Sequence, residues 1–185
     1  MKIRTKAESM KAVKALGVNQ FPEILLTEVD EEKIKSFLEE TKSEWYDFRD
    51  KTKSASPKAR CLKPNEVIDY CKEADVAKFT ISVSFRSYKE HQVCVGELHI
   101  HGDMVDYFLS NNPEHTPRDL LKDPDHSGTA HLFDKKLQYI KGLQTAIDYA
   151  FEYNLIDMIV EFWVFSCPVG IKSEKIVVRE LRIDY

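Results

Sequence analysis

Two apolar segments near the end of the chain constrain its fold most strongly. Residues 156–165 and 175–184 alternate in the manner of β-strands, and a turn containing Pro168, Val169 and Gly170 separates them. The sequence therefore predicts an antiparallel hairpin. If this hairpin is symmetric about residues 170 and 171, Glu161 lies directly opposite Glu180.

The expected pairing of Glu161 with Glu180 brings two like charges together in an otherwise apolar hairpin, which is destabilising on a sheet. A bound Mg²⁺ ion would remove the conflict, because magnesium prefers carboxylate, phosphate and water oxygens. Arg182 would then share the face of Glu180 and meet the phosphates. The alternative is a solvated strand face on which Arg182 and Lys175 screen the two glutamates.

The rest of the chain alternates between helical and strand patterns. Helical spacing is expected over 6–16, after Asp30, after Pro64 and over 134–153. Strands are expected at 21–29 and 44–50 and as three antiparallel strands within 77–110. Residues 111–133 are polar and broken by prolines, which is typical of a long loop. This order predicts an α+β fold, with helices packed on a mostly antiparallel sheet. We expect one domain of two lobes around a cleft, divided near residue 75.

Composition excludes several classes of protein. The 185 residues carry 27 Lys and Arg against 31 Asp and Glu, a net charge of −4, which argues against a dedicated nucleic-acid binder. A basic run over 51–63 could nevertheless contact phosphate. The sequence shows neither a signal peptide nor an uninterrupted apolar stretch long enough to span a membrane. The four cysteines form no C-x-x-C pair, and we expect reduced thiols in a cytoplasmic protein.

Two further cations occupy positions suited to an anion. Lys6 begins the first expected helix, whose free N–H groups and dipole attract negative charge. Arg49 ends an expected strand, in the sequence YDFRD. The alternatives are a plain surface lysine at position 6, and an ion pair of Arg49 with Asp47 or Asp50.

Histidines suggest a second kind of chemistry. In LHIHGD, we expect His99, His101 and Asp103 on one face of a strand and turn, where alternating histidines can chelate a metal. The alternative is an exposed sheet face with no ligand. His115, His126 and His131 lie in the expected loop, which could form a lid in which His126 or His131 donates to a phosphate or acts as a base.

Several short motifs together resemble the ATP-grasp nucleotide-binding domain of the phosphoenolpyruvate synthase, pyruvate phosphate dikinase and rifampicin phosphotransferase type. In this sequence they read TKAE at 5–8, LGVNQFP at 16–22, FRDK at 48–51, DMIVEFW at 157–163 and VVRELR at 177–182. Glu180 stands where that family usually has Gln, and Asp50 and Lys51 replace two serines. The motifs cover the two ends of the chain, and residues 64–135 match none of them.

The resemblance implies an ATP-binding site. Lys6, Arg49 and Arg182 would bind the phosphates, with Arg49 and Arg182 offsetting the charge that develops during catalysis, while Glu161 and Glu180 would hold Mg²⁺. The expected activity is phosphoryl transfer or ATP-dependent ligation on an unknown acceptor. The alternative is a non-catalytic regulatory module that binds a protein partner, of the kind found in phage or defence systems.

Overall fold

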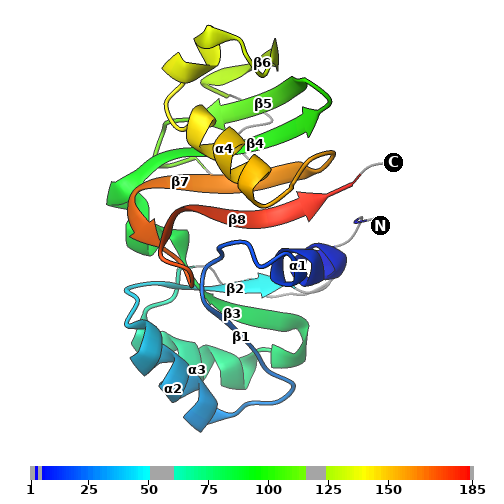
Figure 1. Cartoon of the computed structure of the whole chain (residues 1–185). Coiled ribbons are helices and arrows are strands. Elements are labelled where there is room, and N and C mark those ends of the chain that lie inside the picture. Colours follow the sequence, from blue (N-terminus) through cyan, green and yellow to red (C-terminus); the bar gives the residue numbers. More distant parts are fainter. Residues whose placement is uncertain (1–2, 4–5, 51–60, 116–123, 184–185) are drawn as a thin grey trace. The chain divides into compact units, whose positions relative to one another are not determined.

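The computed structural model describes residue 3 and residues 6–50, 61–115 and 124–183, with only the backbone of residues 6, 7 and 50 (Figure 1). The chain forms two compact units. One comprises Met1–Gln20 with Lys89–Tyr185, and the other is Phe21–Tyr88. The sequence places the division near residue 75 and groups the first residues with the N-terminal lobe, so the structure differs on both points. That the two lobes enclose a cleft stays a prediction.

The smaller unit is a three-stranded antiparallel sheet with two α-helices. The strand order is β1 (Glu23–Leu25), β3 (Phe79–Val83), β2 (Tyr46–Asp50). The helices are α2 (Glu31–Thr41) and α3 (Pro64–Glu73), followed by the short 3-10 helix η1 (Val76–Lys78). Asp30 caps α2 by accepting a hydrogen bond from the Lys33 N–H at 3.0 Å, and Pro64 occupies the first turn of α3, as the sequence predicts. The 3-10 helix η2 (Phe85–His91) leads into the other unit.

The larger unit contains a five-stranded, fully antiparallel sheet. The strand order is β6 (His126–His131), β5 (Met104–Ser110), β4 (Gln92–His101), β7 (Ile159–Val169), β8 (Glu174–Arg182). One face packs against α1 (Lys6–Ala15) and α4 (Leu143–Glu152), and Figure 1 shows α4 lying over the sheet. Buried side chains of both helices and of β4, β7 and β8 form this core, among them Val13, Ile147, Leu98, Val160 and Leu181.

The beginning of the chain is tied to the closing hairpin by the buried Asn19. Its side-chain NH₂ donates to the carbonyls of Val169 and Ile176 at 2.8 and 2.7 Å, and its side-chain oxygen accepts from the Lys172 N–H at 2.9 Å. Helix α1 packs along β8, where the Ser9 hydroxyl accepts from the Leu181 N–H at 2.8 Å. These bonds explain why residues 1–20 belong with the C-terminal part of the chain.

The α+β class with mostly antiparallel sheets is confirmed, but three expected elements differ. The single helix over 134–153 is wrong, because Gly142 takes a φ of +87° and separates the 3-10 helix η3 (Lys135–Tyr139) from α4. Strand β3 pairs with β1 and β2 rather than with β4. The expected loop contains the edge strand β6. Residues 51–60 of the basic run and 116–123 of that loop lie outside the described residues.

Across the part of the chain that the structure describes, we find no helix both long and apolar enough to cross a membrane.

Candidate functional site

Three glutamates form a row across neighbouring strands of the five-stranded sheet. In the register of β4, β7 and β8, Glu97 lies opposite Glu161, and Glu161 lies opposite Glu180. The residues that follow or precede them, Leu98, Val160 and Leu181, point into the core. Because side chains alternate along a strand, the glutamates lie on the face of the sheet that α1 and α4 do not cover.

The sequence predicts the pairing of Glu161 with Glu180, and the structure confirms it. The expected symmetry of the hairpin, however, holds from the pair Ile159–Arg182 to the pair Glu161–Glu180 and breaks at the next residue. Phe162 pairs with Val178, so Arg179 is an extra residue in β8 and forms a β-bulge. The bulge places Arg179 beside the glutamate row, with its guanidinium carbon 5.4 Å from the centre of the Trp163 ring. The turn of the hairpin spans residues 170–173, so Pro168 and Val169 still belong to strand β7.

Arg182 lies beside two of the three carboxylates. Its guanidinium forms an ion pair with Glu97, and its Nη2 atom is 3.7 Å from Glu161 Oε1. The Nε atom of Arg182 is buried and has no hydrogen-bond partner among the described residues. The side chain therefore faces the row as predicted, and its Nε–H group is a donor that no described residue accepts.

The surroundings of Glu161 disfavour the charged form of its carboxylate. Its side chain is 17% exposed, and burial raises its pKa, as do the nearby charges of Glu180 and Glu97. Arg179 and Arg182 act in the opposite direction and do not fully offset these effects. A bound cation would stabilise the ionised form of this group.

The other two predicted cations are not placed against this row. Lys6 begins α1, but its side chain lies outside the described part of the chain. The chain before it does reach the end of β8, since Ile3 forms an isolated antiparallel bridge with Ile183, the residue that follows β8. Arg49 lies on β2 in the smaller unit, where its Nη1 is 3.5 Å from Glu23 Oε2. Among the described side chains, its ion-pair partner is thus Glu23 rather than Asp47.

Glu97 and Arg179 are residues of this site that the sequence analysis missed. Glu97 alternates with His99 and His101 along β4, so its face could have been foreseen, but its neighbours depend on the pairing of β4 with β7. That pairing joins residues far apart in the chain and leaves no local pattern. The alternation of apolar and polar residues in β8 likewise does not predict the bulge at Arg179.

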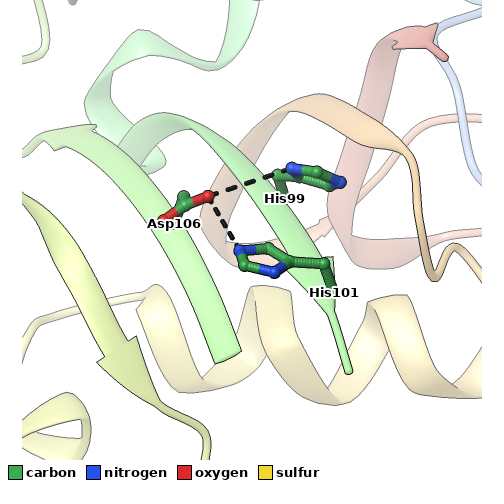
Figure 2. A group of neighbouring side chains, drawn as sticks. All are labelled: His99, His101 and Asp106. Atoms are coloured by element: carbon green, nitrogen blue, oxygen red, sulfur yellow. Dashed lines mark hydrogen bonds and ion pairs between the residues drawn. The ribbon is translucent and has the colours of Figure 1, made fainter. Parts of the chain in front are cut away.

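A second cluster lies on β4 and β5 (Figure 2). His101 Nε2 is 3.0 Å from Asp106 Oδ2, and His99 Nδ1 is 3.9 Å from the same oxygen. Asp106 replaces the expected Asp103, because Asp106 lies directly opposite His99 in the register, whereas Asp103 is in the turn and pairs with His131 at 2.8 Å. A hydrogen bond from Thr129 lowers the pKa of Asp106, with His101 contributing, so Asp106 is a carboxylate at neutral pH.

Several solved structures resemble the chain in fold. A D-alanine–D-alanine ligase from Coxiella burnetii matches 96% of this chain and 47% of its own length, with 13% identity and a TM-score of 0.50. An N5-carboxyaminoimidazole synthase from Aspergillus clavatus, in complex with ADP and 5-aminoimidazole ribonucleotide, matches 98% and 44%, with 11% identity and a TM-score of 0.50. A RiPP-associated ATP-grasp ligase from Chryseobacterium gregarium, in complex with ADP and a leader and core peptide, matches 93% and 49%, with 11% identity and a TM-score of 0.50.

The chain therefore has an ATP-grasp fold and spans about half the length of these three proteins. No protein-family model and no curated protein sequence matches it. The more specific resemblance to the phosphoenolpyruvate synthase type stays a prediction.

Proposed function

We propose that this chain binds magnesium-ATP on the glutamate-bearing face of its five-stranded sheet and uses it for ligation or phosphoryl transfer to an acceptor. The observation that carries the proposal is the row of Glu97, Glu161 and Glu180 on adjacent strands, with Arg182 reaching two of the three carboxylates. The fold it shares with ATP-grasp ligases supports the proposal.

The carboxylates of this row suit a magnesium ion. Glu161 and Glu180 supply hard oxygen ligands from directly opposed positions, and burial and then the charge of Glu180 raise the pKa of Glu161. When bound there, Mg²⁺ would neutralise phosphate charge and hold the phosphates in position. Glu161 and Glu180 would be its protein ligands, and Glu97 would hold Arg182 in place through their ion pair.

The arginines have a different part in this proposal. Arg182 would turn its fork of N–H groups towards phosphate oxygens, because a guanidinium matches two such oxygens at once. Lys6 and Arg49 would add positive charge to the same triphosphate and favour the transition state in which negative charge is spread over the transferred group.

The test is isothermal titration calorimetry with the non-hydrolysable analogue AMP-PNP, with Mg²⁺ and then with EDTA. The wild-type chain should bind in Mg²⁺ and lose most of that affinity in EDTA. Glu161→Gln and Glu180→Gln should each weaken binding in Mg²⁺ by about 10-fold or more, which corresponds to about 1.4 kcal/mol.

Glu174→Gln is the matched control, since Glu174 is on β8 but accepts its hydrogen bond from Tyr153. It should bind like the wild type. The proposal is contradicted if the wild type does not bind AMP-PNP, or if both glutamate variants bind as tightly as Glu174→Gln. Binding without turnover in the presence of candidate acceptors would favour the non-catalytic module.

A further inference from the structure

Two imidazoles and one carboxylate converge on one small space at the end of the β4–β5 hairpin. One ligand atom each from His99, His101 and Asp106 lies within 4.8 Å of the other two. Figure 2 shows both rings turned towards the same oxygen of Asp106. The two imidazole rings lie side by side, with centroids 4.9 Å apart.

The strands hold these three groups in place. His99 and Asp106 are directly opposed in the register, and His101 is two residues further along the same face of β4. The turn that follows begins with Gly102 at a φ of +60°, which permits a tight two-residue hairpin. Groups mounted on paired strands keep their separation better than groups on loops.

Thr129 orients the carboxylate. Its hydroxyl donates to Asp106 Oδ1 at 2.5 Å, and Thr129 lies opposite Asp106 on the edge strand β6. With Oδ1 held in this way, Oδ2 is presented to both histidines. Such an outer partner of a ligating carboxylate is a regular part of metal sites in proteins.

The distances suit a metal with short bonds to nitrogen. Zinc bonds of about 2.0–2.1 Å at tetrahedral angles separate neighbouring ligand atoms by about 3.3 Å. The observed separations of 3.0 and 3.9 Å lie on either side of this value. The shorter contact is also a hydrogen bond between His101 and Asp106.

We propose that His99, His101 and Asp106 bind a divalent transition metal ion, with Zn²⁺ as the favoured ion. Imidazole nitrogen suits Zn²⁺ and its neighbours in the transition series and is a poor ligand for Mg²⁺. Three protein ligands leave a fourth position for water or a substrate atom. The side chains are 23–39% exposed, so an ion can enter from solvent. The cluster uses none of the residues of the glutamate row, although His99 is two residues from Glu97 on the same face of β4, and the proposal does not rest on the proposed function.

The experiment uses tag-free protein freed of metal by a chelator, titrated with Co²⁺ and followed by visible absorption, and titrated with Zn²⁺ by calorimetry. The wild type should bind one equivalent of either ion, and Co²⁺ should develop the intense d–d bands of a low-symmetry site. Thr129→Val should weaken the binding by about 10-fold, as loss of an outer partner does. His99→Gln and His101→Gln should each weaken it further.

His131→Gln is the control, because His131 has an exposure close to that of His101 and pairs with Asp103 outside the cluster. It should bind like the wild type. Absence of binding to the wild type, or an equal loss in His131→Gln and His101→Gln, overturns the proposal. Circular dichroism and melting of each variant establish that it is folded.

Two measurements separate this site from the nucleotide site. Zn²⁺ binding should survive in the double variant of Glu161→Gln and Glu180→Gln, and AMP-PNP binding in Mg²⁺ should survive in His101→Gln. Loss of Zn²⁺ binding in the double glutamate variant would place the ion in the glutamate row and overturn the assignment to the histidines. A chain that binds Zn²⁺ but not AMP-PNP would refute the proposed function alone.

Discussion

Glu161 is a charged side chain in surroundings that disfavour its charge. Its pKa is raised first by burial and then by Glu180, with Glu97 adding to the effect and Arg179 and Arg182 opposing it. Such an arrangement costs stability in the absence of a ligand. Carboxyl groups with perturbed pKa values are common at functional sites.

Glu161→Gln should therefore stabilise the metal-free chain in a pH-dependent way. The folded-state pKa of Glu161 is raised above its value near 4.5 in the unfolded chain, so the folded state binds this proton more tightly. The bound proton therefore stabilises the wild-type chain below pH 4.5, and this contribution is lost as pH rises through the folded-state pKa. Gln does not titrate, so the variant does not lose it. At pH 7.5 in EDTA, the variant should match or exceed the wild type by up to about 1 kcal/mol, the usual size of a relieved like-charge pair.

Urea unfolding of both proteins at pH 4 and pH 7.5 measures this difference. The advantage of the variant should be larger at pH 7.5 than at pH 4. If Glu161→Gln loses several kcal/mol at pH 7.5, Glu161 is a structural partner of Arg182 and not a ligand awaiting a cation.

The planar fork of N–H groups of Arg182 can be tested separately from its positive charge. Arg182→Ala should weaken AMP-PNP binding, and Arg182→Lys should restore only part of it, because an ammonium cannot bind two phosphate oxygens in a planar fork. Lys6→Ala and Arg49→Ala should also weaken binding, although Arg49 lies in the other unit. Calorimetry in Mg²⁺ measures all four. Full recovery in Arg182→Lys would reduce the role of Arg182 to a point charge.

At the scale of elements, Asn19 joins the start of the chain to the β7–β8 hairpin. Asn19→Ala would leave two carbonyls and one N–H of that hairpin without their partner in a buried place. Because each unsatisfied buried group costs about 1–3 kcal/mol, we expect a loss of roughly 3 kcal/mol in the free energy of unfolding. Urea unfolding measures it, and a loss below 0.5 kcal/mol would show that water or relaxation replaces these bonds.

Gly142 explains why the expected long helix is broken. A Cβ atom at this position would lie 2.3 Å from Cys94 Sγ, and the φ of +87° disfavours any other residue. Gly142→Ala should cost more than the roughly 1–2 kcal/mol of the backbone conformation alone. Gly102→Ala is the control, since its φ is +60° but no atom lies within 4 Å of the added Cβ. Equal losses in thermal unfolding would mean that the contact with Cys94 is relieved by small movements.

At the scale of the whole molecule, the sequence predicted the features that depend on residues close together in the chain. The cap at Asp30, the proline at the start of α3 and the strand alternation that opposes Glu161 to Glu180 are all contained in neighbouring residues. These were enough for the α+β class and for two of the three glutamates in the row.

The remaining features depend on contacts between distant segments. The pairing of β4 with β7 adds Glu97 to the row, and the packing of Gly142 against Cys94 interrupts a helical pattern that is otherwise continuous. Strand β3 has the alternation of its neighbours in sequence but pairs in the other sheet. Hydrophobic periodicity carries no information on which strand becomes the partner.

The most direct measurement of the central claim is paramagnetic broadening of backbone amide signals by Mn²⁺–AMP-PNP. Manganese accepts the same oxygen ligands as magnesium, and the His101→Gln background removes the second site. The amides around Glu97, Glu161 and Glu180 should lose intensity together on addition of the complex, and the double variant of Glu161→Gln and Glu180→Gln should abolish the effect. Sharp signals at all three positions, or broadening that persists in the double variant, would contradict a nucleotide-bound metal at the glutamate row.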